Sequence, residues 1–589
     1  MRVTDLSRLA AAELDRLVKG GKPRKKPFAV KDNIATKNHF TTSGSKILQK
    51  YQSPFEATVV DQLRNPKSNP KNGKVVLGKT NLDEFGMGSH STNSFFGPVL
   101  GMSPLRRHSV GGSSGGSAMA VVTGECGFAL GTDTGGSVRL PAAYTGIFGF
   151  KPSYGRISRW GVIPYANSLD TVGVLGTSAQ SILETLTPEV MYSESRDPTS
   201  LGAKSLYRMR NERKVLAISS GRVHRNEGVG QYLQTNFRRL KIGIPMEYNI
   251  AELDPAVREE WRHALNLFQE RGCTLVPVSL PNTKHALSAY YIIAAAEAAS
   301  NLAKYDGVRY GTRADSSDGA GNVLYSRTRG EGLGDEVKRR ILLGSYTLSS
   351  KAIDNYFIKA QKVRRLVQRD FDRVFALPNL LRYQEQFNLS DMAETVPMED
   401  KKGPPQVDFI VCPTSPTLPP TRNVVQKQSS VETYMNDVFT VPSSLAGLPA
   451  ISIPFKLPGK QPGFAGIQII GQFSDDYRLL LTASALAKLQ ARKASLVKKH
   501  TAALIRRVTS SKGFQKGSEE TVRIRTHLST ESFEVKTYLS SGKSFDLRKH
   551  PTVGGENRMR EPRTAKEIDR FVEDAFGDWD SMTSGDNQK

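Results

Sequence analysis

The chain has 589 residues, enough for two to four average domains or for one large α/β domain with additions. Its formal net charge of +25 favours a polyanionic partner, nucleic acid before an acidic membrane surface, although a basic tail without a partner explains it equally well. Cys126, Cys273, Cys412 and the nine histidines show neither disulfide-framework nor metal-ligand spacing, which argues against a secreted disulfide scaffold and against a zinc site.

Residues 1–27 predict a short helical and basic lead-in. Leucines at positions 6, 9, 14 and 17 have helical spacing over residues 4–18, and a basic linker follows over residues 19–26. Three acidic residues before position 16 make this segment a poor secretory or transit peptide. No window of the chain reaches the roughly 18 uncharged apolar residues that a membrane span needs.

The next stretch, to about residue 180, is rich in Gly and Ser and contains short apolar runs. Residues 27–30 and 75–77 read as strands, and residues 117–131 read as a small-residue helix followed by a strand. Glycine-rich turns between such elements indicate α/β layering.

A polar, basic stretch over residues 189–236 predicts an exposed irregular insertion, and a strand follows at 240–245. Residues 254–271 predict a helix, because Asp254 suits the N-cap, Pro255 suits the first helical position and Gly272 follows the end. A strand at 274–278 completes a strand–helix–strand unit.

Helical patterns cover residues 288–304 and 336–376, and strands are expected at 408–413 and 466–471. We therefore expect an α/β fold in which residues 28–495 form one large domain, with a mixed central sheet and helices on both faces. Insertions are expected at 189–236 and 378–405. Residues 496–589 are polar and poor in apolar runs, which predicts a largely disordered extension.

The densest chemical signal is a pair of Gly/Ser loops, GGSSGGSA at 111–118 and GTDTGGSVRLPAA at 131–143. Neither fits a P-loop or a dinucleotide fingerprint, and taken alone they are equally well explained as structural turns. Lys31 follows an apolar strand-like run, so desolvation would lower its pKa and let the neutral amine serve as a base for a serine nucleophile. No histidine lies in a comparable setting.

Together, Lys31, Ser113 and Ser137 resemble the signature of the amidase signature family. The resemblance implies a Ser-cisSer-Lys triad in which Ser137 attacks an amide carbonyl, while Ser113, after a cis peptide bond, relays the proton to Lys31. It also implies an oxyanion hole formed by the backbone N–H groups of Thr134, Gly135, Gly136 and Ser137 itself.

Motifs beyond the signature are similar to one branch of that family, the glutamine-hydrolysing subunits of tRNA-dependent amidotransferases. They are GKTNLDEFGMGS at 78–89, the block at 290–311, the helix start at 336–341 and NDVFTVPSSLAGLP at 436–449. The resemblance implies that Arg340 binds the α-carboxylate of glutamine, that Asp437 binds its α-ammonium and that Tyr290 forms a hydrogen-bonding wall. The alternatives for these residues are a surface ion pair and a core tyrosine.

The branch implies hydrolysis of glutamine through a γ-glutamyl ester on Ser137. The ammonia would pass to the B subunit of the amidotransferase, which activates Glu-tRNA(Gln) with ATP and Mg²⁺ and converts it to Gln-tRNA(Gln), with a small third subunit completing a heterotrimer. We expect no cofactor or metal on this chain itself. Insertions and a polar tail favour the organellar type, hence the mitochondrial matrix, with the cytoplasm as the alternative.

Two other functions stay open at the level of sequence. A stand-alone amidase acting on a small or fatty amide would have an apolar acyl channel in place of Arg340 and Asp437. A non-catalytic RNA-binding scaffold would explain the charge of +25 but would not need Lys31, Ser113 and Ser137.

The chain departs from the family pattern in its short lead-in, at residues 66–73, in the loop 101–108 and in the two insertions. The short lead-in leaves docking of the small partner in question. The basic first part of the tail is either a solvated extension or a contact for tRNA phosphates.

Overall fold

The computed structural model describes residues 27–67, 72–102, 106–187, 190–191, 193–219, 237–315, 323–382, 406–457, 463–510, 523–528, 533–538 and 544–545. The chain divides into two compact units, Met1–Leu496 and Val497–Lys589. The helix expected over residues 4–18 lies outside the described residues, as do residues 220–236 and 383–405 of the two insertions. The assignment of residues 28–495 to one functional domain stays a prediction.

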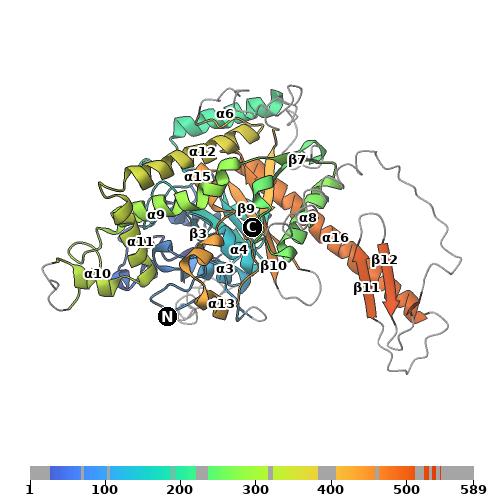
Figure 1. The fold of residues 1–589 in the computed structure, drawn as a ribbon, viewed down its shortest axis with the longest axis horizontal. Coiled ribbons are helices and arrows are strands. Elements are labelled where there is room, and N and C mark those ends of the chain that lie inside the picture. The colour runs from blue at the N-terminus through green and yellow to red at the C-terminus, as the bar shows by residue number, and fades with distance from the viewer. Residues whose placement is uncertain are drawn as a thin grey trace, which may run out of the picture. The chain divides into compact units, whose positions relative to one another are not determined.

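The first unit is built on a mixed sheet of ten strands (Figure 1), in the order β2-β1-β3-β5-β4-β9-β10-β8-β6-β7. Neighbouring strands are parallel in the two outer groups, β2-β1-β3 and β8-β6-β7, and antiparallel between them. The expected α/β fold with a mixed central sheet is confirmed. The strands are β1 (Pro27–Lys31), β2 (Val75–Thr80), β3 (Phe128–Asp133), β4 (Phe148–Lys151), β5 (Thr171–Gly176), β6 (Lys241–Pro245), β7 (Thr274–Val278), β8 (Phe409–Pro413), β9 (Ala450–Lys456) and β10 (Phe464–Gly471).

Helices pack on this sheet in two groups (Figure 1). The short helices α3 (Gly115–Val122) and α4 (Arg139–Thr145) lie against central strands, and α8 (Pro255–Gln269) lies against β8 and β10. A separate layer forms around α9 (Ala286–Leu302), which packs against α11 (Asp335–Thr347), α12 (Lys359–Val374) and α15 (Val441–Ala446). Further α-helices among the described residues of this unit are α2 (Thr58–Arg64), α5 (Ala179–Thr185), α6 (Ala203–Ser219), α10 (Ser326–Gly332), α13 (Arg422–Lys427) and α14 (Ser430–Met435).

The expected strand–helix–strand unit is confirmed as β6, α8 and β7, with β6 parallel to β7. Asp254 caps α8 by accepting a hydrogen bond from the backbone of Ala256 at 2.8 Å, and Gly272 adopts a φ of +83° beyond the helix. The parallel pairing explains why a helix must join the two strands, since a crossover is needed to return the chain to the same edge.

Two expectations about helices need correction. Residues 336–376 form α11 and α12 with a π-helical turn, Asp354–Ile358, before α12, because serines and loop residues after Thr347 interrupt the pattern. The insertion at 189–236 is not irregular throughout, since it contains the 17-residue helix α6. The sequence of α6 has no continuous apolar stripe at helical spacing, so its periodicity did not indicate a helix.

The second unit contains three described strands, β11 (Arg523–Leu528), β12 (Phe533–Tyr538) and β13 (Ser544–Phe545), which form an antiparallel sheet. The polar composition did not indicate these strands. The helix α16 (Asp476–Ser510) begins in the first unit and runs past its boundary. The expected disorder stays a prediction, because most of residues 511–589 lie outside the described residues.

Candidate active site

Lys31 is the last residue of β1, which lies between the parallel strands β2 and β3. Its side chain is completely buried, and its Nζ donates hydrogen bonds to Ser113 Oγ at 2.7 Å and to the carbonyl oxygen of Thr132 at 3.2 Å. Burial lowers the pKa of Lys31 to about 7, against the opposing effect of nearby carboxylates, Asp83 first. A large fraction of this amine is therefore neutral near pH 7, as a proton acceptor requires.

Ser113 lies two residues before α3, in a glycine-rich segment that leaves little space around it. The peptide bond between Gly112 and Ser113 is cis, the configuration that the family resemblance implies, and the Ser113 side chain is fully buried. A Cβ at Gly111 would lie 2.6 Å from the Cα of Pro141, so only glycine permits this close approach. The buried hydroxyl of Ser113 is held against Lys31 by the hydrogen bond of 2.7 Å.

Ser137 lies in the loop between β3 and α4 and keeps 8% of its surface exposed. Its carbonyl oxygen accepts a hydrogen bond from the backbone N–H of Ser114 at 3.1 Å, so the two Gly/Ser loops are in direct contact. The structure thus brings Lys31 and Ser113 together by a side-chain hydrogen bond, and it brings Ser137 beside them through the backbone. The proton relay from Ser137 through Ser113 stays a prediction.

A buried ion pair fixes the loop that carries Ser137. Asp133 accepts from Arg139 Nη2 at 2.9 Å and from Arg139 Nε at 3.0 Å, and neither side chain is exposed. Arg139 also donates to the carbonyl of Thr440 and to the hydroxyl of Ser443. Burial alone would raise the pKa of Asp133, but the Arg139 guanidinium holds it below its ordinary value. Sequence reasoning missed this pair, although Asp133 and Arg139 flank the Gly/Ser loop within one motif.

The loop expected to form the oxyanion hole is pressed against the expected substrate-binding side chains. A Cβ at Gly135 would lie 2.6 Å from Cζ of Tyr290. A Cβ at Gly136 would lie 2.4 Å from Thr440 Oγ1 and 2.9 Å from Asp437 Oδ1. Any side chain at these two positions would displace Tyr290 or Asp437, so glycine is needed for the recognition residues to approach the backbone. Thr134, at the start of the loop, donates through Oγ1 to Asp170 at 2.7 Å.

Arg340 is a residue of α11, and its buried side chain is surrounded by aromatic rings. Its Nη1 donates to the hydroxyl of Tyr165 at 2.6 Å, and its Nε donates to Glu336 at 2.8 Å. The guanidinium lies 5.2–5.6 Å from the ring centres of Tyr165, Tyr291 and Tyr434. Aromatic faces stabilise a guanidinium when both are removed from water. Sequence reasoning missed these three tyrosines, and only Tyr291, beside Tyr290, carried a signal.

Asp437 lies on the other side of Tyr291. Its Oδ2 accepts hydrogen bonds from Ser89 Oγ at 2.8 Å and from the hydroxyl of Tyr291 at 3.3 Å. Burial raises the pKa of Asp437 to about 6. Tyr290 packs edge-on against Tyr291, with ring centres 4.9 Å apart. The structure therefore places Tyr290 and Asp437 beside the Gly135–Gly136 loop. Tyr291 connects Asp437 to Arg340 through its hydroxyl and its ring.

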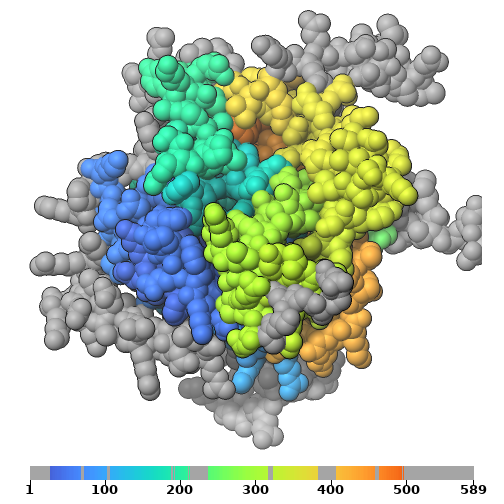
Figure 2. Space-filling view, turned by 90° about the vertical axis from the view of Figure 1, so that its left-hand side faces the viewer, coloured from blue at the N-terminus to red at the C-terminus, as the bar shows by residue number. Residues whose placement is uncertain are grey.

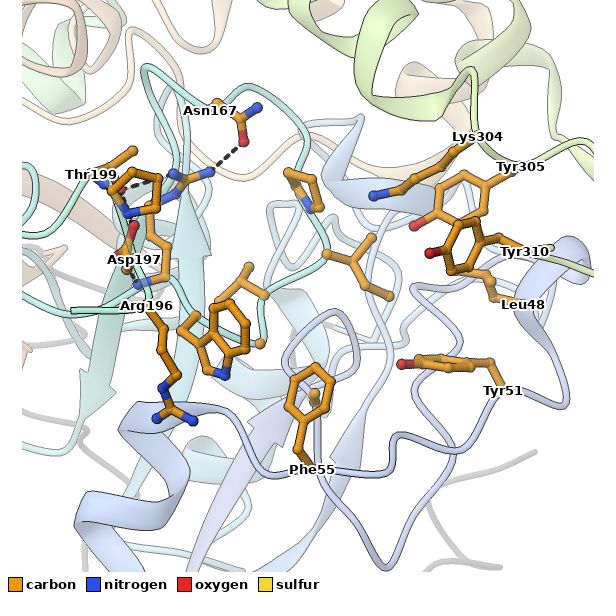
Figure 3. A pocket seen from close by; sticks show the side chains of 18 of the residues that line it. Leu48, Tyr51, Phe55, Asn167, Arg196, Asp197, Thr199, Lys304, Tyr305 and Tyr310 are labelled. Atoms are coloured by element: carbon orange, nitrogen blue, oxygen red, sulfur yellow. Dashed lines mark hydrogen bonds between the residues drawn. The ribbon is translucent and has the colours of Figure 1, made fainter. Parts of the chain in front are cut away.

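A separate hollow of 740 Å³ is bordered by the segments 48–55, 159–167, 196–199 and 304–311. Figure 3 shows Lys304, Tyr305 and Tyr310 on one side of it and the loop 196–199 on the other. In Figure 2 the blue and lime-green segments that border it meet along a crease. None of the expected site residues is among its described lining residues. The chemistry of this chain is therefore assigned from the Lys31–Ser113 geometry and not from this hollow.

No group of three His, Cys, Asp or Glu side chains arranged to hold a metal ion occurs within the described ranges. Likewise, the helices that the structure describes include none long and apolar enough to cross a membrane. The pair formed by Lys31 and Ser113 places a buried amine against a hydroxyl beside a glycine-rich loop.

Comparisons with known proteins identify a family and several similar proteins. A family model described as Amidase matches residues 3–480. The chain is 58% identical over 468 residues to the mitochondrial glutamyl-tRNA(Gln) amidotransferase A subunit of Fusarium vanettenii, covering 78% of this chain and 86% of that protein. The protein of the same name from Podospora anserina is 59% identical over 470 residues, covering 78% and 89%. The solved structure of the glutamyl-tRNA(Gln) amidotransferase A subunit from Thermotoga maritima is 30% identical, with a TM-score of 0.57 and coverage of 81% and 89%.

Proposed function

The chain belongs to the amidase family, and on that premise we propose that it is the glutamine-hydrolysing A subunit of a mitochondrial glutamyl-tRNA(Gln) amidotransferase. One structural observation carries the choice of glutamine. A buried carboxylate, Asp437, lies against Gly136 in the loop that bears Ser137. A buried guanidinium, Arg340, packs on the ring of Tyr291, whose hydroxyl donates to Asp437. A carboxylate is bound best by a guanidinium fork, and an ammonium by a carboxylate, so this pair suits the two charged ends of an amino acid.

In the proposed reaction, Ser137 Oγ attacks the side-chain amide carbon of glutamine. Ser113 accepts the proton of Ser137 and passes its own proton to Lys31 Nζ, to which it is already hydrogen-bonded at 2.7 Å. Negative charge develops on the amide oxygen, which the N–H groups of the 134–137 loop stabilise. The carbon–nitrogen bond then breaks, the proton returns to the leaving nitrogen, and ammonia departs.

Water completes the cycle by attacking the γ-glutamyl ester on Ser137, with Lys31 and Ser113 again taking the proton. The products are glutamate and ammonia, so one water molecule is consumed for each glutamine. The depressed pKa of Lys31, about 7, suits both roles, because the amine must accept a proton and release it within one cycle.

The proposal extends to an assembly, because an A subunit works with partners. We assign to the B subunit the ATP and Mg²⁺ that activate glutamate on Glu-tRNA(Gln), and we expect a small third subunit. The ammonia produced on this chain would convert Glu-tRNA(Gln) to Gln-tRNA(Gln). The two relatives named as mitochondrial proteins support the mitochondrial matrix as the location.

The stand-alone amidase alternative is less well supported, because an apolar acyl group gains nothing from a buried Arg340 and Asp437. The experiment is to purify the chain with its partner subunits and to measure release of glutamate and ammonia from glutamine, beside hydrolysis of acetamide and of a long-chain fatty amide. Preferential turnover of glutamine supports the proposal. Preferential turnover of the fatty amide would replace it with the stand-alone amidase.

A further inference from the structure

One buried carboxylate, that of Asp83, connects the two ends of the segment that follows β2, residues 83–93, by hydrogen bonds. Asp83 Oδ2 accepts the backbone N–H of Ser91 at 2.8 Å, and its Oδ1 accepts the backbone N–H of Asn93 at 2.9 Å. The Asp83 side chain is completely buried. A buried acceptor bound by two backbone donors fixes the conformation of the segment between them.

This segment is hydrogen-bonded to the backbone on both sides of Ser113. The hydroxyl of Ser91 donates to the carbonyl of Gly111 at 2.8 Å and accepts from the N–H of Gly115 at 3.0 Å. The backbone N–H of Asp83 donates to the carbonyl of Ser113 at 3.3 Å. Residues on both sides of Ser113, and Ser113 itself, are thus bound to the segment that Asp83 closes.

The same segment reaches the recognition side of the site. Ser89 lies two residues before Ser91, and its hydroxyl donates to Asp437 at 2.8 Å. No space is left around the Asp83 carboxylate for a side chain at two neighbouring glycines. A Cβ at Gly88 would lie 2.4 Å from the carboxylate, and a Cβ at Gly112 would lie 2.3 Å from it. The carboxylate therefore packs tightly between the 83–93 segment and the loop that contains Gly112 and Ser113. A shift of the segment would displace that loop.

We propose that Asp83 is a positioning residue that couples the two halves of the site, because the segment it fixes is hydrogen-bonded both to the backbone around Ser113 and, through Ser89, to the Asp437 carboxylate. This inference rests on the proposed glutamine hydrolysis. Neither a relative's name nor the triad assigns Asp83 a role, and the proposal follows from its contacts on both sides.

The charges that face Lys31 allow an electrostatic test. The carboxylates acting on it are Asp83, Asp133 and Asp170, in decreasing order of effect, and Asp133 is already neutralised by Arg139. On the 83–93 segment itself, Glu84 is engaged by Ser45 and by the backbone N–H of Gly334, and burial lowers the pKa of His90 to about 4, which keeps it neutral. Burial raises the pKa of Asp83 itself to about 6, so its carboxylate is charged above pH 6, and removing that charge should lower the pKa of Lys31.

The test compares Asp83→Asn with Asp370→Asn in the assembled complex, using the pH profile of kcat at saturating glutamine. Asp370 is a matched control, because it too is a buried carboxylate that accepts hydrogen bonds from one residue, Asn282, at 2.8 and 2.9 Å. For Asp83→Asn we expect kcat to fall about tenfold, KM for glutamine to rise, and the acid limb to move down by about one pH unit. Asp370→Asn should leave the acid limb in place.

A third variant separates positioning from charge. Ser91→Ala removes the hydrogen bonds to Gly111 and Gly115 but keeps the Asp83 carboxylate. It should therefore lower kcat without moving the acid limb. It also keeps the inference testable if Asp83→Asn does not fold. An unchanged acid limb in folded Asp83→Asn, or an unchanged kcat in Ser91→Ala, would overturn the inference while leaving glutamine hydrolysis standing. Retained turnover in Ser137→Ala would instead overturn the proposed function itself.

Discussion

The site has two sides that are built in different ways. The triad side consists of Lys31 and two serines, held by glycine-rich backbone and by a hydrogen bond of 2.7 Å between Lys31 and Ser113. The recognition side consists of Arg340 and Asp437, held by tyrosines and bonded to Glu336 and Ser89. The first side depends on the charge state of one amine, and the second on two opposite charges that persist at neutral pH. Changes on the first side should therefore alter turnover, and changes on the second should alter affinity.

Ser137→Ala should have the largest effect, because it removes the proposed covalent acceptor without changing any charge. We expect glutamine hydrolysis to fall by at least ~10³-fold, as for loss of a nucleophile. The matched control is Ser117→Ala, a buried serine of α3 whose hydroxyl donates to the carbonyl of Leu130 at 2.9 Å. Ammonia release in the assembled complex measures both variants. Ammonia release by Ser137→Ala at nearly the wild-type rate would contradict the assignment of the reaction to Lys31, Ser113 and Ser137.

Lys31→Ala should be almost as damaging, because neither serine then has a base, and Lys31→Arg should fail as well, because a guanidinium keeps its proton. For the wild type, the rate should rise with pH through about 7, where the neutral amine becomes the major form. Lys151 is an informative control, since burial lowers its pKa to about 7 too, but it donates to the carbonyls of Pro152 and Leu448. Lys151→Met should keep the wild-type pH dependence of the remaining activity. A flat wild-type profile between pH 6 and 9 would contradict Lys31 as the base.

Arg340→Ala and Asp437→Ala should chiefly raise KM for glutamine, by a factor that corresponds to about 2–5 kcal/mol for an unpaired buried charge. An amide without α-substituents should be affected much less. Because the pKa of Asp437 is about 6, KM for glutamine should also rise as pH falls below 6 and the carboxylate is protonated. Arg382→Ala, which breaks an ion pair of 2.6 Å with Asp372, serves as the control. Equal effects on both substrates would favour the stand-alone amidase.

How far the sequence predicts the site follows the same division. The triad side lies in short motifs, so residue type and the family resemblance pointed to Lys31, Ser113 and Ser137, and the structure brings Lys31 and Ser113 into hydrogen-bond contact. Their catalytic roles stay a prediction. The recognition side is assembled from α9, α11 and the segments near residues 165 and 434, which are distant in sequence. Nothing in the residues around Tyr165 or Tyr434 indicates that their rings face Arg340, because that contact arises only when the helical layer packs on the sheet.

The fold shows a comparable limit. The helix α8 was predictable because Asp254, Pro255 and Gly272 mark both of its ends, and an apolar stripe faces the sheet. The helix α6 has no such stripe, and β11 and β12 lie in a polar stretch. Local pattern identifies an element when the element buries one face against the core. Elements stabilised in other ways leave no comparable periodic signal in the sequence.

The smallest effect is expected from the second unit. Removing residues 511–589 should leave glutamine hydrolysis unchanged, because every residue proposed for chemistry or recognition lies between Lys31 and Asp437. A cut at residue 495 would interrupt α16, which runs to Ser510, so Ser510 is the better end point. Steady-state hydrolysis of free glutamine measures the effect. Loss of turnover on truncation after Ser510 would make the second unit part of the catalytic body.

The comparison between a chain ending at Ser510 and one ending at Leu496 tests whether this region adds affinity for tRNA. The 14 residues that differ contain four cations, Lys498, Lys499, Arg506 and Arg507, and no acid. If they contact phosphates, tRNA affinity of the complex should fall with salt more steeply for the longer chain, with a slope difference of at most about 3–4. Little preference among tRNA sequences is expected, since phosphate contacts carry no base information. If tRNA affinity falls equally steeply with salt for the two chains, these cations are exposed to solvent and do not contact tRNA. The positive charge of the chain would then need another explanation.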